Sequence, residues 1–267
     1  MTAATPAIEA FFLQRGDNRR FALHHVPAAT TGCAWVFLHA FAEEMNFSRR
    51  ACALQARALA GAGSAVLQFD LAGCGDSDGE FADATWSRWV EDGVSAVDWL
   101  ARRTGSRVGL CGLRAGCLLA CDVAARLDIQ VPLMLCAPIA DGESHWRQFR
   151  RLGRIGSAMS SAKAETDPMP GAIEIAGYVV SDAMRDGLCS ARLQLPANIS
   201  GVGIIDIAPA QAPGSAIVEA MSAEASNRAE MRFASERVES APFWQIPETD
   251  DCTGIEGATL RIAAAIS

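Results

Sequence analysis

Four stretches of the chain are largely apolar along their whole length, and they constrain the fold more than any other feature of the sequence. They show no alternation of polar and apolar residues, which is typical of strands buried on both faces of a parallel sheet. These stretches are Ala34–Leu38, Ala65–Phe69, Arg107–Cys111 and Val131–Cys136. The sequence therefore predicts a mostly parallel sheet with helices on both faces.

Helical periodicity separates these strands. Apolar residues recur at helical spacing within Phe47–Leu59 and Trp86–Leu100, and Gly116–Leu127 is apolar nearly all round. Strands that alternate with helices form right-handed β–α–β crossovers, which place helices on both faces of a parallel sheet. We therefore expect an α/β protein with a doubly wound sheet, whose third helix is buried in the domain centre.

The rest of the chain extends this pattern at both ends and interrupts it once. A turn at Arg15–Asn18 predicts an N-terminal β-hairpin, and the mixed composition of residues 143–200 predicts a lid-like insertion over the carboxyl edge of the sheet. We interpret residues 1–267 as one domain. The further expected elements are hairpin strands Ile8–Leu13 and Phe21–Val26, strand Val202–Ile207, helix Ser215–Arg228, strand Met231–Val238 and helix Ile255–Ile266.

Charge and cysteine usage exclude several classes of function. The formal net charge of −8 and the pI of about 5.1 argue against nucleic acid or an anionic membrane surface as a partner. The nine cysteines form no CxxC pair and no Cys/His ligand spacing, so we expect free thiols, no metal site and no cofactor. With no leader or membrane span expected, a cytoplasmic protein is predicted; the oligomeric state is left open.

The stretch Gly112-Leu113-Arg114-Ala115-Gly116 joins a buried strand directly to a buried helix. This arrangement is that of the Gly-x-Ser-x-Gly nucleophile elbow of the α/β-hydrolase fold, where glycines allow strand and helix to approach closely. We therefore predict the α/β-hydrolase fold, with Arg114 at the position of the nucleophilic serine.

Arg114 excludes serine-type covalent catalysis at the elbow, because a guanidinium stays protonated and is no nucleophile. Two interpretations of this side chain are open: an ion pair inside the pocket, or a contact with an anionic group of a ligand. A base histidine is expected after the last strand, yet the four histidines are His24, His25, His39 and His145. The Ser-His pair of a triad is therefore predicted to be missing.

Polar residues after the first parallel strand supply the other candidate catalytic groups. His39 ends that strand and is interpreted either as a structural histidine or as part of an oxyanion hole. Glu43 and Glu44 suit the N-terminus of the following helix, and one of them is a candidate partner for Arg114, with Asp70 as a competitor. The candidate ligand-binding residues are Asn46, Arg50 and Trp244, the last either packing the pocket wall or stacking on a ligand.

Three aspartates of one turn, and one cysteine after the elbow, are interpreted as structural residues. Asp70, Asp76 and Asp78 lie in a glycine-rich turn, where aspartate bonds the backbone, and their spacing falls short of a calcium loop. Cys117 lies in the first helical turn near a cation, which could lower its pKa, but a core thiol is the simpler interpretation.

Four segments together resemble the exosortase A system-associated hydrolase 2 family of the α/β-hydrolase superfamily. They are Phe41–Arg50, Phe69–Gly79, Gly112–Gly116 and Pro242–Trp244, and the resemblance is good over roughly residues 8–142. It implies a bacterial protein that accompanies exopolysaccharide synthesis and exosortase-dependent sorting. The N-terminal half is also similar to serine aminopeptidase-type hydrolases, whose Ser and His have no counterpart here.

Two functions remain open at the level of the sequence. One is a hydrolase or acyl-transfer enzyme in which Glu43 or Glu44 activates water and Arg114 holds an anionic or carbonyl oxygen. The other is a catalytically silent pseudo-enzyme that binds a ligand or partner of the polysaccharide-export system. A small molecule, or an acyl- or glycan-related group, is the expected ligand.

Overall fold

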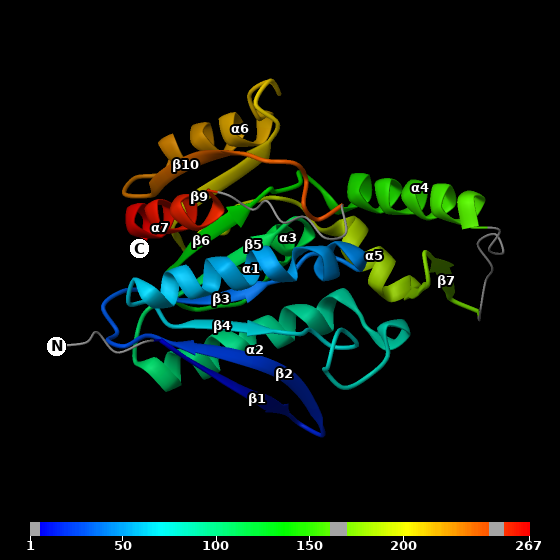
Figure 1. The fold of residues 1–267 in the computed structure, drawn as a ribbon, viewed down its shortest axis with the longest axis horizontal. Coiled ribbons are helices and arrows are strands. Elements are labelled where there is room, and N and C mark those ends of the chain that lie inside the picture. The colour runs from blue at the N-terminus through cyan, green and yellow to red at the C-terminus, as the bar shows by residue number, and fades with distance from the viewer. Residues whose placement is uncertain (1–5, 161–169, 246–253) are drawn as a thin grey trace.

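The computed structural model describes residues 6–160, 170–245 and 254–267. An eight-stranded sheet in the order β1-β2-β4-β3-β5-β6-β9-β10 runs through its centre (Figure 1). All neighbours from β4 to β10 pair in parallel, while β1 and β2 form an antiparallel hairpin that adds antiparallel to β4. The strands are β1 (Ala7–Arg15), β2 (Asn18–Val26), β3 (Ala34–Leu38), β4 (Val66–Phe69), β5 (Val108–Leu113), β6 (Val131–Cys136), β9 (Ile199–Ala208) and β10 (Arg232–Glu239).

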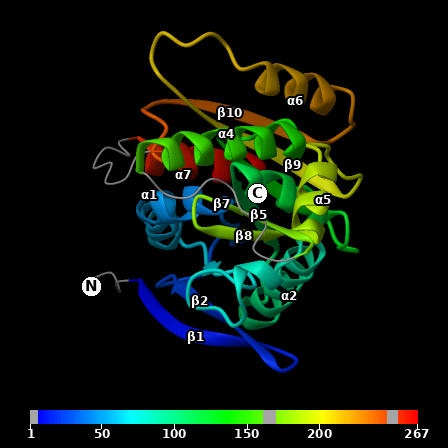
Figure 2. The same ribbon diagram turned by 90° about the vertical axis from the view of Figure 1, so that its right-hand side faces the viewer.

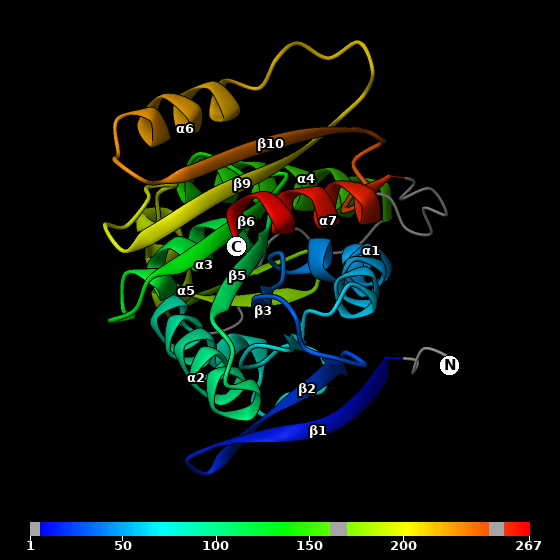
Figure 3. The same ribbon diagram turned by 90° about the vertical axis from the view of Figure 1, so that its left-hand side faces the viewer.

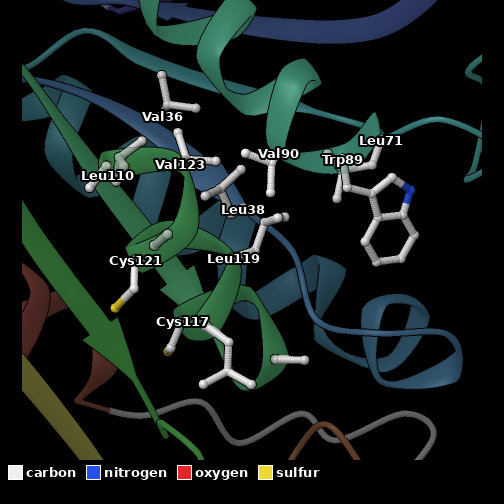
Figure 4. Close-up of a cluster of buried hydrophobic side chains, with 14 of the residues drawn as sticks. Val36, Leu38, Leu71, Trp89, Val90, Leu110, Cys117, Leu119, Cys121 and Val123 are labelled. Carbon is white, nitrogen blue, oxygen red and sulfur yellow. The ribbon is translucent and has the colours of Figure 1, made fainter. Parts of the chain in front are cut away.

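Helices cover both faces of this sheet. Because successive side chains of a strand point to opposite faces, Trp35 and Phe37 of β3 pack toward α1 and α7, whereas Val36 and Leu38 pack toward α2 and α3. Helices α1 and α7 lie side by side on their face (Figure 3), and the core beneath α2 and α3 is drawn in Figure 4. The helices are α1 (Glu43–Gly61), α2 (Trp86–Thr104), α3 (Ala115–Ala124), α6 (Ala216–Ser226), which packs on β9 and β10, and α7 (Ile255–Ile266).

The segment predicted as an insertion contains regular elements of its own. It holds α4 (Gly142–Ser160), the antiparallel pair β7 (Ala172–Ile175) and β8 (Tyr178–Ser181), and α5 (Asp182–Ser190). These elements gather at the end of the molecule toward which the central parallel strands run (Figures 1 and 2). The predicted insertion therefore contains more regular secondary structure than its mixed composition indicated.

The structure confirms the α/β-hydrolase fold and its mostly parallel sheet. The predicted bounds of β3, β6 and α7 are those of the structure. Within the described ranges, no helix has both the length and the apolar character needed to cross a bilayer.

Candidate functional site at the elbow

Arg114 is the single residue between β5 and α3, and its backbone is strained. It has φ 55° and ψ −118°, a positive φ in a residue that is not glycine. Such conformations are costly and persist where the surroundings hold them, often at functional sites. Here the Arg114 N–H donates to the Cys136 carbonyl at 3.0 Å, and the Arg114 carbonyl accepts from the Cys117 N–H at 2.9 Å. The elbow is therefore tied to β6 on one side and to α3 on the other.

Gly112 allows the elbow strand β5 to approach helix α3, and Gly116 allows α3 to approach the end of the neighbouring strand β3. A Cβ atom at Gly112 would collide with the carbonyl of Gly116, and one at Gly116 would collide with the carbonyl of Leu38. Both obstacles are backbone atoms, which cannot rotate away as a side chain can. The spacing of the two glycines thus has the physical cause that the sequence motif predicts.

The Arg114 side chain is buried between a carboxylate and an indole ring. Its Nε and Nη2 atoms both lie 3.4 Å from Oε1 of Glu44, and its guanidinium carbon lies 5.0 Å from the ring centre of Trp244. Only 9% of Arg114 is exposed. The expected pairing with a carboxylate is confirmed, and the partner is Glu44 rather than Glu43 or Asp70.

The pKa values of Glu44 and His145 are both shifted from their ordinary values. Burial raises the pKa of Glu44 from 4.5 to about 7, although the neighbouring Arg114 guanidinium acts in the opposite direction. Burial and then repulsion by Arg114 lower the pKa of His145 from 6.5 to about 3. At neutral pH the site therefore combines a cation, a carboxyl group near its titration midpoint and an uncharged imidazole.

Three buried polar atoms at this site have no hydrogen-bond partner among the described residues. They are Oε2 of Glu44, Nδ1 of His145 and Nε1 of Trp244. The Nε2 atom of His145 lies 3.9 Å from Oε2 of Glu44, which is too long for a hydrogen bond. Buried polar groups are normally satisfied, so these three atoms mark a place where a ligand group can add hydrogen bonds.

His145 is the site residue that the sequence analysis missed. It lies in the first turn of α4, after β6, which neighbours the elbow strand β5. The carboxyl ends of neighbouring parallel strands share one edge of a sheet, so the position of His145 after β6 was an available signal. The sequence motif predicts a base histidine only after the last strand, so His145 was not among the expected site residues.

Glu43 turns away from Arg114 and holds the insertion. Its Oε2 accepts hydrogen bonds from the Tyr178 hydroxyl at 2.8 Å and from the Asn46 side-chain amide at 3.3 Å. The same Asn46 amide donates to the Tyr178 hydroxyl at 3.1 Å. These three side chains therefore connect the first turn of α1 to β8.

His39 bonds the backbone with both ring nitrogens. Its Nδ1–H donates to the Ala40 carbonyl at 2.8 Å, and its Nε2 accepts from the Leu71 N–H at 3.2 Å. Burial lowers its pKa, which agrees with a neutral ring in this arrangement.

Arg50 is exposed further along α1. Of the seven predicted site residues, the structure thus gathers Arg114, Glu44 and Trp244 at the elbow.

The structural interpretations of the aspartate loop and of Cys117 also hold. Asp70 pairs with Arg49 at 3.1 Å and accepts the Asp76 N–H at 3.1 Å, as a turn-forming aspartate does. The Cys117 thiol donates to the Gly112 carbonyl, and burial raises its pKa well above the usual value. In the described part of the chain no group of three or more His, Cys, Asp or Glu side chains is placed to hold a metal ion.

Comparison with known proteins places this elbow in a family. The sequence profile of the X-Pro dipeptidyl-peptidase (S15) family matches residues 19–169, which is more than half of the chain and includes the elbow, Glu44 and His145. The chain belongs to the X-Pro dipeptidyl-peptidase (S15) family. Among curated protein sequences, none matches this S15-family chain significantly.

Solved structures resemble the S15-family chain along nearly its whole length. Est1E from Butyrivibrio proteoclasticus, with ferulic acid bound, has 18% identity and a TM-score of 0.61 and covers 96% of this chain and 97% of its own. A serine hydrolase without a lid from Xanthomonas campestris has 17% identity and a TM-score of 0.55, with 97% of each chain covered. A monoglyceride lipase variant from Saccharomyces cerevisiae has 10% identity and a TM-score of 0.59, covering 100% and 98%. At these identities the likeness shows the fold alone.

Proposed function

We propose that this hydrolase-fold protein binds a ligand at the elbow and does not act on it through a serine nucleophile. The observation that carries this proposal is Arg114 itself, held in the strained elbow conformation with its guanidinium between Glu44 and Trp244. A guanidinium forms no acyl intermediate, but it binds planar anionic groups well. Glu44, His145 and Trp244 then supply the remaining polar contacts, while Asn46 and Arg50 are proposed as more distant ligand contacts.

The electrostatics of the site favour binding because the cation is already present and fixed. The desolvation of a guanidinium that is buried in advance is paid on folding and not when the ligand arrives. The indole ring of Trp244 supports the guanidinium by a cation–π contact and restricts its rotation. The site is thus preorganised around one positive charge.

Hydrolysis or acyl transfer without serine is the second candidate, and the titration of Glu44 favours it. A general base works best when its pKa lies near the operating pH, and the pKa of Glu44 is about 7. In this mechanism Glu44 accepts a proton from water, the resulting hydroxide attacks a carbonyl carbon, and Arg114 stabilises the oxyanion. The intermediate then collapses, the bond to the leaving group breaks, and Glu44 returns the proton to that group. Glu43 and His39, also predicted as catalytic, are assigned no proton transfer in this mechanism, because their side chains bond Tyr178 and the backbone.

The biological setting is inferred from the sequence resemblance. We propose a cytoplasmic role in a bacterial exosortase and exopolysaccharide system. Deletion of the gene is expected to reduce exopolysaccharide yield, and complementation with the Arg114→Met variant is expected to fail if the elbow carries the role. Normal exopolysaccharide in the deletion strain would contradict this association.

Turnover assays decide between the two candidates. Nitrophenyl esters, acyl thioesters and X-Pro nitroanilides, the last chosen from the family name, are expected to give no turnover above that of the Glu44→Gln and Arg114→Met variants. The Glu43→Gln variant is the matched control, because its side chain faces Tyr178 instead of Arg114. Turnover that is lost in Glu44→Gln and kept in Glu43→Gln would establish the hydrolytic candidate instead.

Covalent labelling tests the absence of a serine nucleophile directly. A fluorophosphonate probe followed by peptide mapping is expected to leave residues 107–120 unmodified. The Arg114→Ser variant is expected to remain inactive toward a short nitrophenyl ester, because a serine needs a positioned base and the imidazole of His145 is buried and 3.9 Å from Glu44. A stoichiometric adduct near the elbow in the wild type would contradict the proposal, and an active Arg114→Ser variant would show that a base is positioned at the elbow.

A further inference from the structure

We propose that the ligand of the elbow site carries a carboxylate, and that this carboxylate displaces Glu44 from Arg114 and leaves Glu44 protonated. The inference rests on the proposed binding function and deepens it, because it names the chemical class of the ligand and a proton that is taken up with it.

The first support is the poor coordination of the Glu44 carboxylate. Its Oε1 has two long contacts with Arg114, at 3.4 Å each, and its Oε2 accepts no hydrogen bond from the described residues. Strong pairs between a guanidinium and a carboxylate are shorter and use both oxygens. A ligand carboxylate that reached Arg114 in bidentate geometry would therefore be a better partner than Glu44.

Charge balance selects a carboxylate over a phosphate. Arg114 supplies one positive charge at a buried position, and one negative charge neutralises it. A dianionic phosphate, or a carboxylate added beside an ionised Glu44, would leave an uncompensated negative charge there. A monoanion combined with protonation of Glu44 restores neutrality.

The groups that face Glu44 allow this exchange. Among the described residues, Arg114 at the elbow and His145 on α4 are the titratable groups that lie against it, while its neighbour Glu43 is bonded to Tyr178. His145 stays uncharged at neutral pH, so it does not compete with Arg114 for an anion. The indole Nε1 of Trp244 is only a donor and has no partner among the described residues, so it suits an acceptor such as a carboxylate oxygen.

The proton balance gives the test. Ligand binding releases Glu44 from Arg114, one proton moves from solvent to Glu44, and the ligand remains ionised. We expect benzoate, used as the probe, to bind about tenfold more weakly for each pH unit above about pH 7, where Glu44 must first gain a proton. Calorimetry in two buffers of different ionisation enthalpy should report uptake of up to about one proton per bound benzoate.

Three variants and two other compounds make the result specific. In Glu44→Gln the pH dependence and the proton uptake should disappear, and binding at alkaline pH should become tighter; Glu43→Gln should behave as the wild type. Arg114→Met should lose benzoate binding. Benzamide, which is neutral, and inorganic phosphate should bind more weakly than benzoate.

A measurement on the wild type alone covers the case in which a variant fails to fold. Carbon-13 NMR of labelled glutamates should show the titration of Glu44 moving upward by about one pH unit or more when benzoate is added. Benzoate binding that is independent of pH, no saturable binding, or an unmoved Glu44 titration would overturn the inference. Turnover of a carboxylate-bearing ester in the same sample would instead overturn the binding-only function, and the proton coupling would still be measured.

Discussion

At the scale of single residues, Arg114 combines a strained backbone with a buried charge. Each feature is unfavourable alone: the positive φ costs free energy, and an unpaired guanidinium costs more when water is removed. Both are compensated locally, the backbone by hydrogen bonds to Cys136 and Cys117 and the charge by Glu44 and Trp244. Arg114 is therefore stabilised by its neighbours.

A double-mutant cycle measures how much the pair contributes. For Arg114→Met, Glu44→Gln and the double variant, we expect a coupling free energy between about 1 and 3 kcal/mol in urea unfolding above pH 7. The exposed pair Arg185–Asp182 on α5 is the control and should couple by no more than about 1 kcal/mol. A coupling of zero at Arg114 and Glu44 would show that the contact contributes nothing to stability.

The raised pKa of Glu44 predicts a pH dependence of stability with a definite sign. A carboxyl group that ionises at about 7 in the folded protein and at about 4.5 in the unfolded chain favours folding below the lower value. That contribution is lost as the pH rises through about 7. The free energy of unfolding of the wild type should thus fall relative to Glu44→Gln by up to about 3 kcal/mol between these pH values. A difference that does not change with pH would refute the raised pKa.

Much of the site follows from the sequence, and His145 shows where sequence reasoning stops. The elbow glycines, the exclusion of a nucleophile and the need for a carboxylate partner are local consequences of residue type and position. The choice of Glu44 over Glu43 depends on the direction of adjacent side chains in one helical turn, which no spacing pattern resolves. His145 reaches the site because α4 begins at the carboxyl edge of the sheet, and the position of α4 depends on tertiary packing.

At the scale of elements, continuous apolar strands were the easiest to predict. The strands β3 and β6 are buried along their whole length, so their ends coincide with the ends of their apolar runs. The hairpin β7–β8 was not predicted, because each of its strands has only four residues and only part of each is buried. Strands as short as these, which lie within the insertion, lack the periodicity that identifies longer ones.

The close contact between helix α3, which follows the elbow, and the end of the neighbouring strand β3 predicts a large cost for one added methyl group. Gly116→Ala should destabilise the protein by at least about 1–3 kcal/mol, because its Cβ meets the Leu38 carbonyl. Gly61→Ala, at the end of α1, is the matched control: nothing lies within 4 Å of its Cβ, so the change should be neutral or slightly stabilising. Chemical denaturation of both variants checks the difference, and equal effects would contradict the close approach at the elbow.

The connection between α1 and β8 can be followed through the only tyrosine of the chain. Burial and the hydrogen bond to Glu43 raise the pKa of Tyr178 above its ordinary value of 10.0. Tyrosinate absorbance should therefore appear at higher pH than in a free tyrosine. Its midpoint should move down in Glu43→Gln and stay in place in Glu44→Gln. A normal midpoint in the wild type would mean that β8 is not held to α1 as described.

At the scale of the whole molecule, the insertion and the sheet share one hydrophobic core. Trp146 of α4, Val180 of β8 and Leu188 of α5 are buried in the same cluster as Val36 of β3 and Leu110 of β5. An element that shares its core with the sheet has no separate unfolding unit. This packing supports the proposal that residues 143–200 form a cap integrated into a single domain.

Cooperative unfolding tests that proposal. Far-ultraviolet circular dichroism, tryptophan fluorescence and the absorbance of Tyr178 should give coincident unfolding curves, because they follow the helices and sheet, the core and the insertion. The Tyr178→Phe variant has no tyrosine absorbance, so its unfolding curve provides the baseline for the Tyr178 probe. A Tyr178 transition at lower denaturant than the other two would show that the cap unfolds first and is a separate unit.

The shape of the elbow is set by backbone contacts of Gly112 and Gly116 and by main-chain bonds of residue 114, without help from the side chain at that position. In evolutionary terms the position is exchangeable: descendants of one ancestor can replace the group presented there while the scaffold stays folded. Some serine codons differ from arginine codons by a single nucleotide. One base change can therefore exchange these two side chains at the elbow, whereas a cleaving site would also need the positioned base that a serine nucleophile requires.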